Sequence, residues 1–225
     1  MTFRQLLKAF LNKTFKPIVS LYLSDENFYR YDDISVVIMP EVFHPGLFFS
    51  TKILIDYLND NIKFDAIQFL DLGCGSGLIS ILAAKKNAVV FASDINIHAI
   101  NNTLKNLEMN KQKATVIYSD LFDQIPRQIF DIIVINPPYF RGIAQNDAEK
   151  AWYAGKDLEF FQNLFQQLPD FMNFDSETIM ILSDECEIGK IREYAETNNF
   201  LMVEVYRKER YWEINFIFKI TKNKN

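Results

Sequence analysis

Apolar residues follow two different spacings along most of the chain. From residue 66 onward, short apolar runs alternate with segments in which apolar residues recur every three or four positions. The runs predict buried strands, and the segments predict amphipathic helices. We expect strands at 67–72, 88–93, 115–118, 131–135 and 178–182, and helices at 78–86, 97–109, 158–168 and 188–197. This alternation predicts an α/β fold with a doubly wound, mostly parallel sheet.

Two further strand patterns close the chain. Residues 200–206 and 211–220 are strand-like, and the charged segment Arg207–Arg210 separates them. Two strands with a short charged connection predict an antiparallel hairpin at one edge of the sheet. Together with the five strands above, this terminal hairpin gives a seven-stranded sheet.

The N-terminal part has a different pattern. We expect a helix at 3–13, strands at 28–31 and 34–39, and a helix at 47–58. Asp32 and Asp33 form a turn signal between the two strands, which predicts a hairpin. The chain is therefore divided into a small helix-and-hairpin appendage, 1–45, and a larger α/β domain, 46–225.

Composition limits the class of protein. A chain of 225 residues that is 49% hydrophobic can bury the core of one such domain. Cys74 and Cys186 lie far apart without metal-ligand spacing, so no disulfide framework and no metal site are expected. The first twenty residues lack a signal-peptide pattern, and no apolar run approaches the roughly 20 residues that cross a bilayer. We expect a cytoplasmic protein without a membrane partner; the net charge of −5 counts against nucleic acid.

A glycine-rich turn joins the first parallel strand to its helix. Residues 71–77 read Asp-Leu-Gly-Cys-Gly-Ser-Gly, and the residues expected to bind a ligand are Asp71, Gly73, Gly75 and Gly77. Glycines allow backbone angles and close ligand approaches that a Cβ would prevent. The spacing differs from the dinucleotide fingerprint, and an early carboxylate suits a cationic amino group better than a pyrophosphate. A glycine-rich turn without chemical use is the alternative.

The next two strands also end in acidic residues. Asp94 and Ile95 follow the second strand, and Asp120 and Leu121 follow the third. In open α/β sheets, ligands bind at the carboxyl ends of strands. An acid in the position of Asp94 can accept both ribose hydroxyls, although it could equally cap a helix. Asp120 can accept an adenine amino group while Leu121 packs on the ring, or it can simply belong to a turn.

The fourth strand ends in Asn136-Pro137-Pro138-Tyr139, and we expect a long loop at 137–156 to follow it. The prolines remove backbone donors and stiffen the turn. The side-chain oxygen of Asn136 and the carbonyl near Pro137 can then accept both hydrogens of a planar –NH₂ group, while Tyr139 offers an aromatic face. We expect Asn136, Pro137 and Tyr139 to be catalytic, and Asn136 also to contact the cofactor.

These motifs carry a family resemblance. Asp-x-Gly-x-Gly-x-Gly resembles motif I of the class I S-adenosylmethionine-dependent methyltransferases. Asn-Pro-Pro-Tyr resembles the motif of the HemK-type glutamine N-methyltransferases and their small-domain relatives. The likeness runs from about Val42 to the C-terminus, and Ala151–Asp157 resembles the glycine-rich segment of that family. It implies a Rossmann-like fold and S-adenosylmethionine as the cofactor.

The expected reaction is transfer of a methyl group to an amide or amino nitrogen. The resemblance and the acidic net charge favour a protein substrate, a glutamine side chain, over nucleic acid. A nucleobase amine, adenine N6 or guanine N2 of RNA or DNA, presents the same planar group and is the first alternative. The others are a non-catalytic cofactor-binding subunit and a nicotinamide-dependent oxidoreductase. The oligomeric state stays open.

Overall fold

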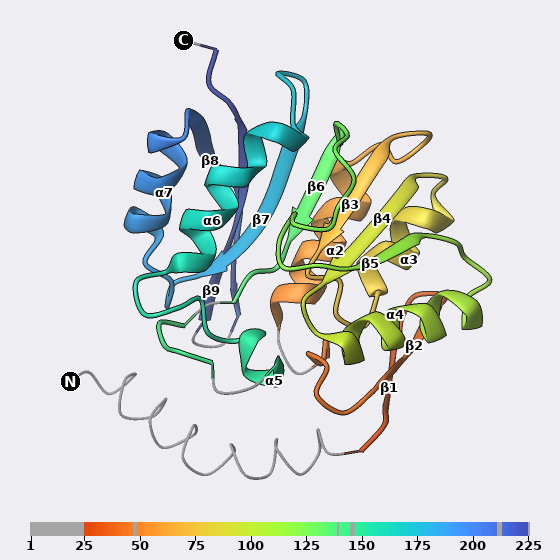
Figure 1. Cartoon of the computed structure of the whole chain (residues 1–225). Coiled ribbons are helices and arrows are strands. Elements are labelled where there is room, and N and C mark those ends of the chain that lie inside the picture. Colours follow the sequence, from red (N-terminus) through yellow and green to blue (C-terminus); the bar gives the residue numbers. More distant parts are fainter. Residues whose placement is uncertain (1–24, 47–48, 139, 145–146, 211–212, 225) are drawn as a thin grey trace.

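The computed structural model describes residues 25–46, 49–138, 140–144, 147–210 and 213–224. A seven-stranded sheet lies at its centre, in the order β5-β4-β3-β6-β7-β9-β8 (Figure 1). β9 runs antiparallel to β7 and β8, whereas the other neighbouring strands are parallel. The strands are β3 (Gln68–Leu72), β4 (Val89–Asp94), β5 (Thr115–Tyr118), β6 (Ile132–Ile135), β7 (Glu177–Ser183), β8 (Phe200–Arg210) and β9 (Glu213–Lys222). The predicted α/β class, parallel sheet and terminal antiparallel hairpin are confirmed.

Helices cover both faces of this sheet (Figure 1). One buried cluster joins the sheet to α2, α3 and α4, and the other joins it to α6 and α7. The helices are α2 (Phe49–Asn61), α3 (Leu78–Lys85), α4 (Ile97–Met109), α5 (Asp147–Lys150), α6 (Glu159–Gln167) and α7 (Ile188–Thr197), with the 3₁₀ helix η1 (Leu168–Phe171) after α6. The predicted 3–13 helix and the first two residues of the predicted 47–58 helix lie outside the described residues.

The position of strand β6 in the middle of the sheet explains why its sequence is continuously apolar. Ile132 and Val134 belong to one buried cluster, while Ile133 and Ile135 belong to the other. Successive side chains of a strand point to opposite faces, so a central strand covered on both sides needs apolar residues throughout. The strand therefore ends abruptly where the polar Asn136 begins, at the carboxyl edge of the sheet.

The N-terminal hairpin packs onto this domain rather than standing apart from it. Strands β1 (Asn27–Tyr31) and β2 (Ile34–Ile38) pair antiparallel around the turn at Asp32, as predicted. Tyr31, Ile34 and Val36 are buried in the same cluster as the apolar face of α2. The division of the chain at residue 45 stays a prediction.

Asn102 and Asn106 on α4, and Asn110, which caps the C-terminal end of this helix, hold β2 in place. They are four residues apart and so share one face of the helix. Each side chain accepts an N–H from the β2 segment and donates to a C=O of it, as a neighbouring strand would. Asn102 bonds Met39 N and Val37 O, Asn106 bonds Val37 N and O, and Asn110 bonds Ser35 N and O. Asn106 also donates to Ser76 O at 2.9 Å, which connects the hairpin to the glycine-rich turn.

Two predicted boundaries were wrong. The charged Arg207–Arg210 segment is not the hairpin connection, because β8 continues through it and Arg210 pairs with Glu213. The guanidinium of Arg207 lies 4.9 Å from the ring centre of Phe216, which stabilises the extended strand. The expected loop at 137–156 contains α5 and two isolated bridges, Phe140 with Tyr153 and Gly142 with Gly155.

Within the described part of the chain, the helices are too short or too polar to cross a membrane. The same residues contain no group of three or more His, Cys, Asp or Glu side chains that could hold a metal ion.

Candidate functional site

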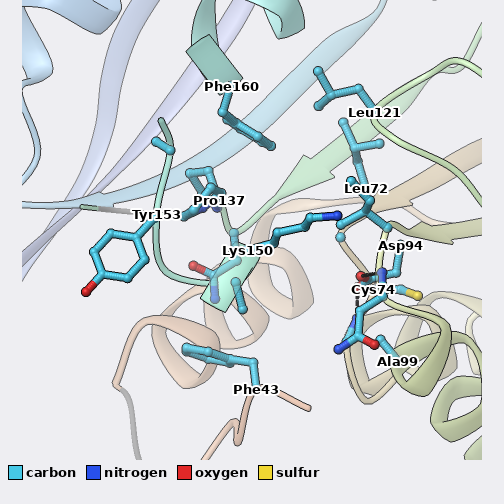
Figure 2. A pocket seen from close by; sticks show the side chains of 18 of the residues that line it. Phe43, Leu72, Cys74, Asp94, Ala99, Leu121, Pro137, Lys150, Tyr153 and Phe160 are labelled. Atoms are coloured by element: carbon cyan, nitrogen blue, oxygen red, sulfur yellow. Dashed lines mark hydrogen bonds between the residues drawn. The ribbon is translucent and has the colours of Figure 1, made fainter. Parts of the chain in front are cut away.

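A cavity of about 460 Å³ opens at the carboxyl ends of β3, β4 and β6. Its size lies in the range typical of small-molecule sites, and its position is where open α/β sheets bind ligands. Figure 2 shows Leu72, Cys74 and Asp94 on one side and Pro137 and Tyr153 on the other. The predicted residues that line it are Asp71, Gly73, Gly75, Asp94, Ile95, Asp120, Leu121, Asn136 and Pro137. The four predicted sites therefore converge.

The glycine-rich turn has backbone angles of the kind that its glycines allow. Gly73 and Gly75 have φ angles of 82° and 53°, in the left-handed region. A Cβ on either glycine would meet no protein atom within 4 Å, so both face open space. Gly77 differs, because a Cβ there would lie 2.9 Å from the Thr103 side chain. Gly77 therefore serves the packing of the turn on α4 and is not among the lining residues.

Asp71 is buried beneath the turn. Its Oδ2 accepts bonds from the backbone N–H of Ser80 at 3.0 Å and from the Ser80 hydroxyl at 2.6 Å. Burial raises the pKa of Asp71 to about 6, although the bonds from Ser80 oppose this shift. The carboxylate is charged at neutral pH in a place where little water solvates it, and a cationic ligand group would relieve that cost.

Asp94 connects the turn to the start of α4. Its Oδ2 accepts from Gly75 N and its Oδ1 from Asn96 N, both at 2.9 Å. Burial raises the pKa of Asp94, and these backbone bonds oppose the rise. The N-cap of α4 is Asn96, whose side chain accepts from His98 N. The capping alternative for Asp94 is therefore wrong, and its carboxylate lines the cavity.

Asp120 and Leu121 form the wall that follows β5. Leu121 is buried with a φ of 46°, and its carbonyl accepts from the Ser119 hydroxyl at 3.0 Å. Asp120 is exposed at the rim. An apolar side chain below an exposed carboxylate is an arrangement that fits a flat ring with an amino group at its edge.

Asn136 lies half-buried at the end of β6. Its side-chain nitrogen donates to Thr51 Oγ1 at 3.2 Å and to Ser50 Oγ at 3.4 Å. Both hydroxyls come from the first turn of α2, so this helix orients the amide. Pro137 and Pro138 are buried behind it. Tyr139, the third predicted catalytic residue, lies outside the described residues.

A covering segment, residues 140–144 and 147–156, contributes lining residues on one side of the cavity. Phe140 N donates to Trp152 O and Ala154 N donates to Phe140 O, both at 2.8 Å, so its two ends lie side by side. Gly155 has a φ of 96°, and a Cβ there would collide with the Glu159 carboxylate. The ring of Trp152 packs 5.2 Å from that of Phe43, which comes from the segment before α2.

Sequence reasoning missed several lining residues. Lys150, Tyr153 and Phe160 reach the cavity from the covering segment and α6 (Figure 2). No pattern in the sequence singles out Lys150, because it belongs to a short helix inside a predicted loop. Thr51 was visible near the start of its helix, but the bond to Asn136 depends on tertiary packing. His44 is absent from the cavity lining and accepts from Gly46 N through Nδ1.

Comparison with known proteins identifies the family of this chain. The family described as "Methyltransferase small domain" matches residues 33–153, which is more than half of the chain. The chain belongs to the methyltransferase small-domain family. The match begins in the N-terminal hairpin and ends beside the cavity, so it includes the glycine-rich turn, Asp94, Asp120 and Asn136.

Sequence relatives in this family carry names that concern ribosomal RNA. "Ribosomal RNA small subunit methyltransferase C" of Haemophilus influenzae (strain Rd) is 27% identical over 191 residues, which is 77% of this chain and 56% of the relative. The chain spans about half the length of the curated relatives it matches.

Solved structures show the same fold. The 16S rRNA N2-guanine methyltransferase RsmC of T. thermophilus, in complex with AdoMet and guanosine, has a TM-score of 0.64 at 20% identity, covering 88% of this chain and 50% of that one. The E. cuniculi Mtq2–Trm112 complex, responsible for methylation of the termination factor eRF1, has a TM-score of 0.62 at 19% identity, covering 81% and 99%. The predicted class I methyltransferase fold is confirmed.

Proposed function

We propose that this chain is an S-adenosylmethionine-dependent N-methyltransferase that acts on an exocyclic amine of a nucleobase in RNA, with guanine N2 as the first candidate. The observation that carries the proposal is the position of Asn136. Its oriented amide stands at the end of β6, in the same cavity as the glycine-rich turn and Asp94. A methyl donor and an amine acceptor would therefore meet there.

The cavity residues fit the cofactor. The open faces of Gly73 and Gly75 admit a ligand against the backbone, and Asp94 offers a carboxylate for ribose hydroxyls. Asp71 supplies buried negative charge suited to an ammonium group. Asp120 and Leu121 suit the edge and face of adenine. When bound, S-adenosylmethionine supplies an electrophilic methyl group on its sulfur.

The protein's own contribution is to orient the acceptor. An amine attached to a base ring is a weak nucleophile because its lone pair is delocalised. The Asn136 nitrogen donates to Thr51 and Ser50, so the side-chain oxygen accepts one amine hydrogen, and the carbonyl near Pro137 accepts the other. The lone pair held in this way would form the N–C bond to the methyl carbon that bound S-adenosylmethionine would supply; sulfur would keep the electron pair of the S–C bond, and the surplus amine proton would pass to water. Orientation and preorganised acceptors lower the barrier.

The choice of substrate rests on the relatives. The expectation of a protein glutamine came from the likeness to HemK-type enzymes and from net charge. Relatives named for ribosomal RNA match by sequence over most of this chain, whereas the eRF1-methylating complex resembles it in fold. Net charge sums over all residues and says little about one binding face. These observations favour the nucleobase alternative, and protein glutamine becomes the second candidate.

Methyl-labelled S-adenosylmethionine tests the proposal. The protein is incubated separately with small ribosomal subunits, protein-free ribosomal RNA and the protein fraction of the source cell, and the incorporated label is counted. Asn136→Ala serves as the inactive control. We expect label in RNA with the wild-type chain and background label with the variant. Label confined to protein would contradict the RNA assignment, and no label in any fraction would contradict the catalytic one.

A further inference from the structure

Lys150 lines the cavity but is not among the site residues predicted from the sequence. It ends the short helix α5, within the segment that covers the cavity. Figure 2 shows its side chain extending across the cavity, with the ammonium on the side of Leu72 and Asp94. Its charge is thus placed on the side of the strand ends and the glycine-rich turn, where a cofactor would lie.

The charge of the cavity explains why a cation matters there. The acidic lining residues are Glu41, Asp71, Asp94, Asp120 and Glu159, and the basic ones are Lys150 and Lys156. An excess of carboxylates suits the ammonium and sulfonium of S-adenosylmethionine, but it repels the carboxylate at the same end of that molecule. A ligand with both signs of charge needs a positive group inside an acidic cavity.

The glycine-rich turn supplies few donors for that carboxylate. Gly73 N and Cys74 N donate to Ser93 O at 2.8 and 2.9 Å, and Gly75 N donates to Asp94. Helix-opening turns often bind anions through such N–H groups, but here these N–H groups are occupied within the protein. The negative end of the ligand therefore needs a partner other than these three N–H groups.

Resting on the proposed function, we infer that Lys150 binds the carboxylate of S-adenosylmethionine. The long lysine side chain brings a point charge from the covering segment to the ligand's amino-acid end. The same segment lies between Asn136 and α6, so the group that recognises the carboxylate is attached to the acceptor side of the site. Lys156, also a lining residue but solvent-exposed, is the matched control.

Two ligands that differ only in the carboxylate test this role. Titration calorimetry measures binding of S-adenosylmethionine and of decarboxylated S-adenosylmethionine to the full chain and to Lys150→Ala, Lys150→Arg and Lys156→Ala. The wild-type chain should prefer the complete cofactor by about tenfold or more, the size of one charge-assisted hydrogen bond. Lys150→Ala should lose most of this preference and bind the decarboxylated ligand almost normally. Lys150→Arg should keep most of the preference, and Lys156→Ala should keep all of it.

The result separates this inference from the proposed function. Equal weakening of both ligands in Lys150→Ala would mean that Lys150 only supports the fold of the segment. An unchanged preference would assign the carboxylate to another donor, such as the first turn of α3. Either outcome overturns the Lys150 inference while cofactor binding stands. Failure of the wild-type chain to bind either ligand would overturn both.

Discussion

Asn136 donates a side-chain N–H to the hydroxyl of Thr51 across 3.2 Å. Through this bond, the start of α2 fixes the side chain that ends β6. A hydroxyl can donate or accept; here both hydroxyls accept from Asn136, so the amide nitrogen faces α2 and the amide oxygen does not. Thr51 is thus a positioning residue for Asn136.

Removing the Thr51 hydroxyl should slow catalysis without weakening the binding of the cofactor. Thr51→Val keeps the shape of the side chain, and Ser50→Ala in the same chain removes the second, longer bond. We expect the double variant to lose about tenfold or more in kcat, since misorientation at a reacting centre is costly. The dissociation constant for S-adenosylmethionine should change little. Thr51→Ser is the control that should retain activity, and equal kcat in the double variant would refute the positioning role.

Asp94 should govern cofactor affinity. In Asp94→Asn the side-chain oxygen can still accept one of the two backbone bonds from Gly75 and Asn96, so the turn keeps part of its support. Loss of the charged acceptor should weaken binding of S-adenosylmethionine by about 1.5–3 kcal/mol. Calorimetry measures this directly. Asp123→Asn makes the same chemical change at an exposed residue that does not line the cavity, and this control variant should bind S-adenosylmethionine normally.

Asp71 should make stability depend on pH. Its pKa rises from 3.8 in the unfolded chain to about 6 in the fold, so the folded state holds the proton more tightly. Stability of the ligand-free chain therefore falls as the pH rises from about 4 to 6, and then stays level as far as this group is concerned. A shift of about two pKa units corresponds to about 3 kcal/mol.

Comparison of Asp71→Asn with the wild-type chain measures this effect. The variant should be more stable by about 2–3 kcal/mol at pH 7.5 and nearly equal near pH 4 in urea unfolding. Its cofactor affinity at pH 7.5 should be lower, because the charge that attracts an ammonium is gone. A variant that is less stable at pH 7.5 would show that the bonds from Ser80 outweigh the burial of charge.

Asn106 should be important for the fold and for the turn. It is fully buried, and its side chain joins Val37 of the hairpin to Ser76 O. Asn106→Ala leaves those buried backbone groups without their partner, which should cost about 3 kcal/mol or more in the free energy of unfolding. Asn110→Ala breaks equivalent bonds to Ser35 in a partly exposed place, where water can replace them. Equal losses in the two variants would argue against a special role of the buried member.

Much of the sheet could be predicted from the sequence because its strands are short apolar runs with helices between them. The 115–118 strand and the 97–109 and 188–197 helices were placed to the residue. The end of β8 was missed because Arg207–Arg210 looks like a turn. Only the fold places the ring of Phe216 under the guanidinium of Arg207. It also places the ring centre of Phe49 4.3 Å from the guanidinium of Arg210.

Site residues were predicted where they belong to a continuous sequence motif. They were missed where their position in the cavity depends on contacts between residues that are distant in the sequence. Asp71, Asp94 and Asn136 follow strand patterns directly. Thr51 and Lys150 enter the cavity from a helix start and from a short helix in a predicted loop, so their positions required the fold. Asn102 and Asn106 look like part of the polar face of an exposed helix, and only their bonds to the β2 segment show why they are buried.

The central claim concerns the atom that receives the methyl group. Small-subunit ribosomal RNA is treated with S-adenosylmethionine and either the wild-type chain or Asn136→Ala. The RNA is then digested, and its nucleosides are identified by mass spectrometry. We predict a wild-type-dependent nucleoside methylated on an exocyclic amine, N2-methylguanosine or N6-methyladenosine, which the variant forms at least about 10²-fold more slowly. Methylation on a ribose or ring atom, methylglutamine in a protein digest instead, or undiminished activity of Asn136→Ala would contradict the account.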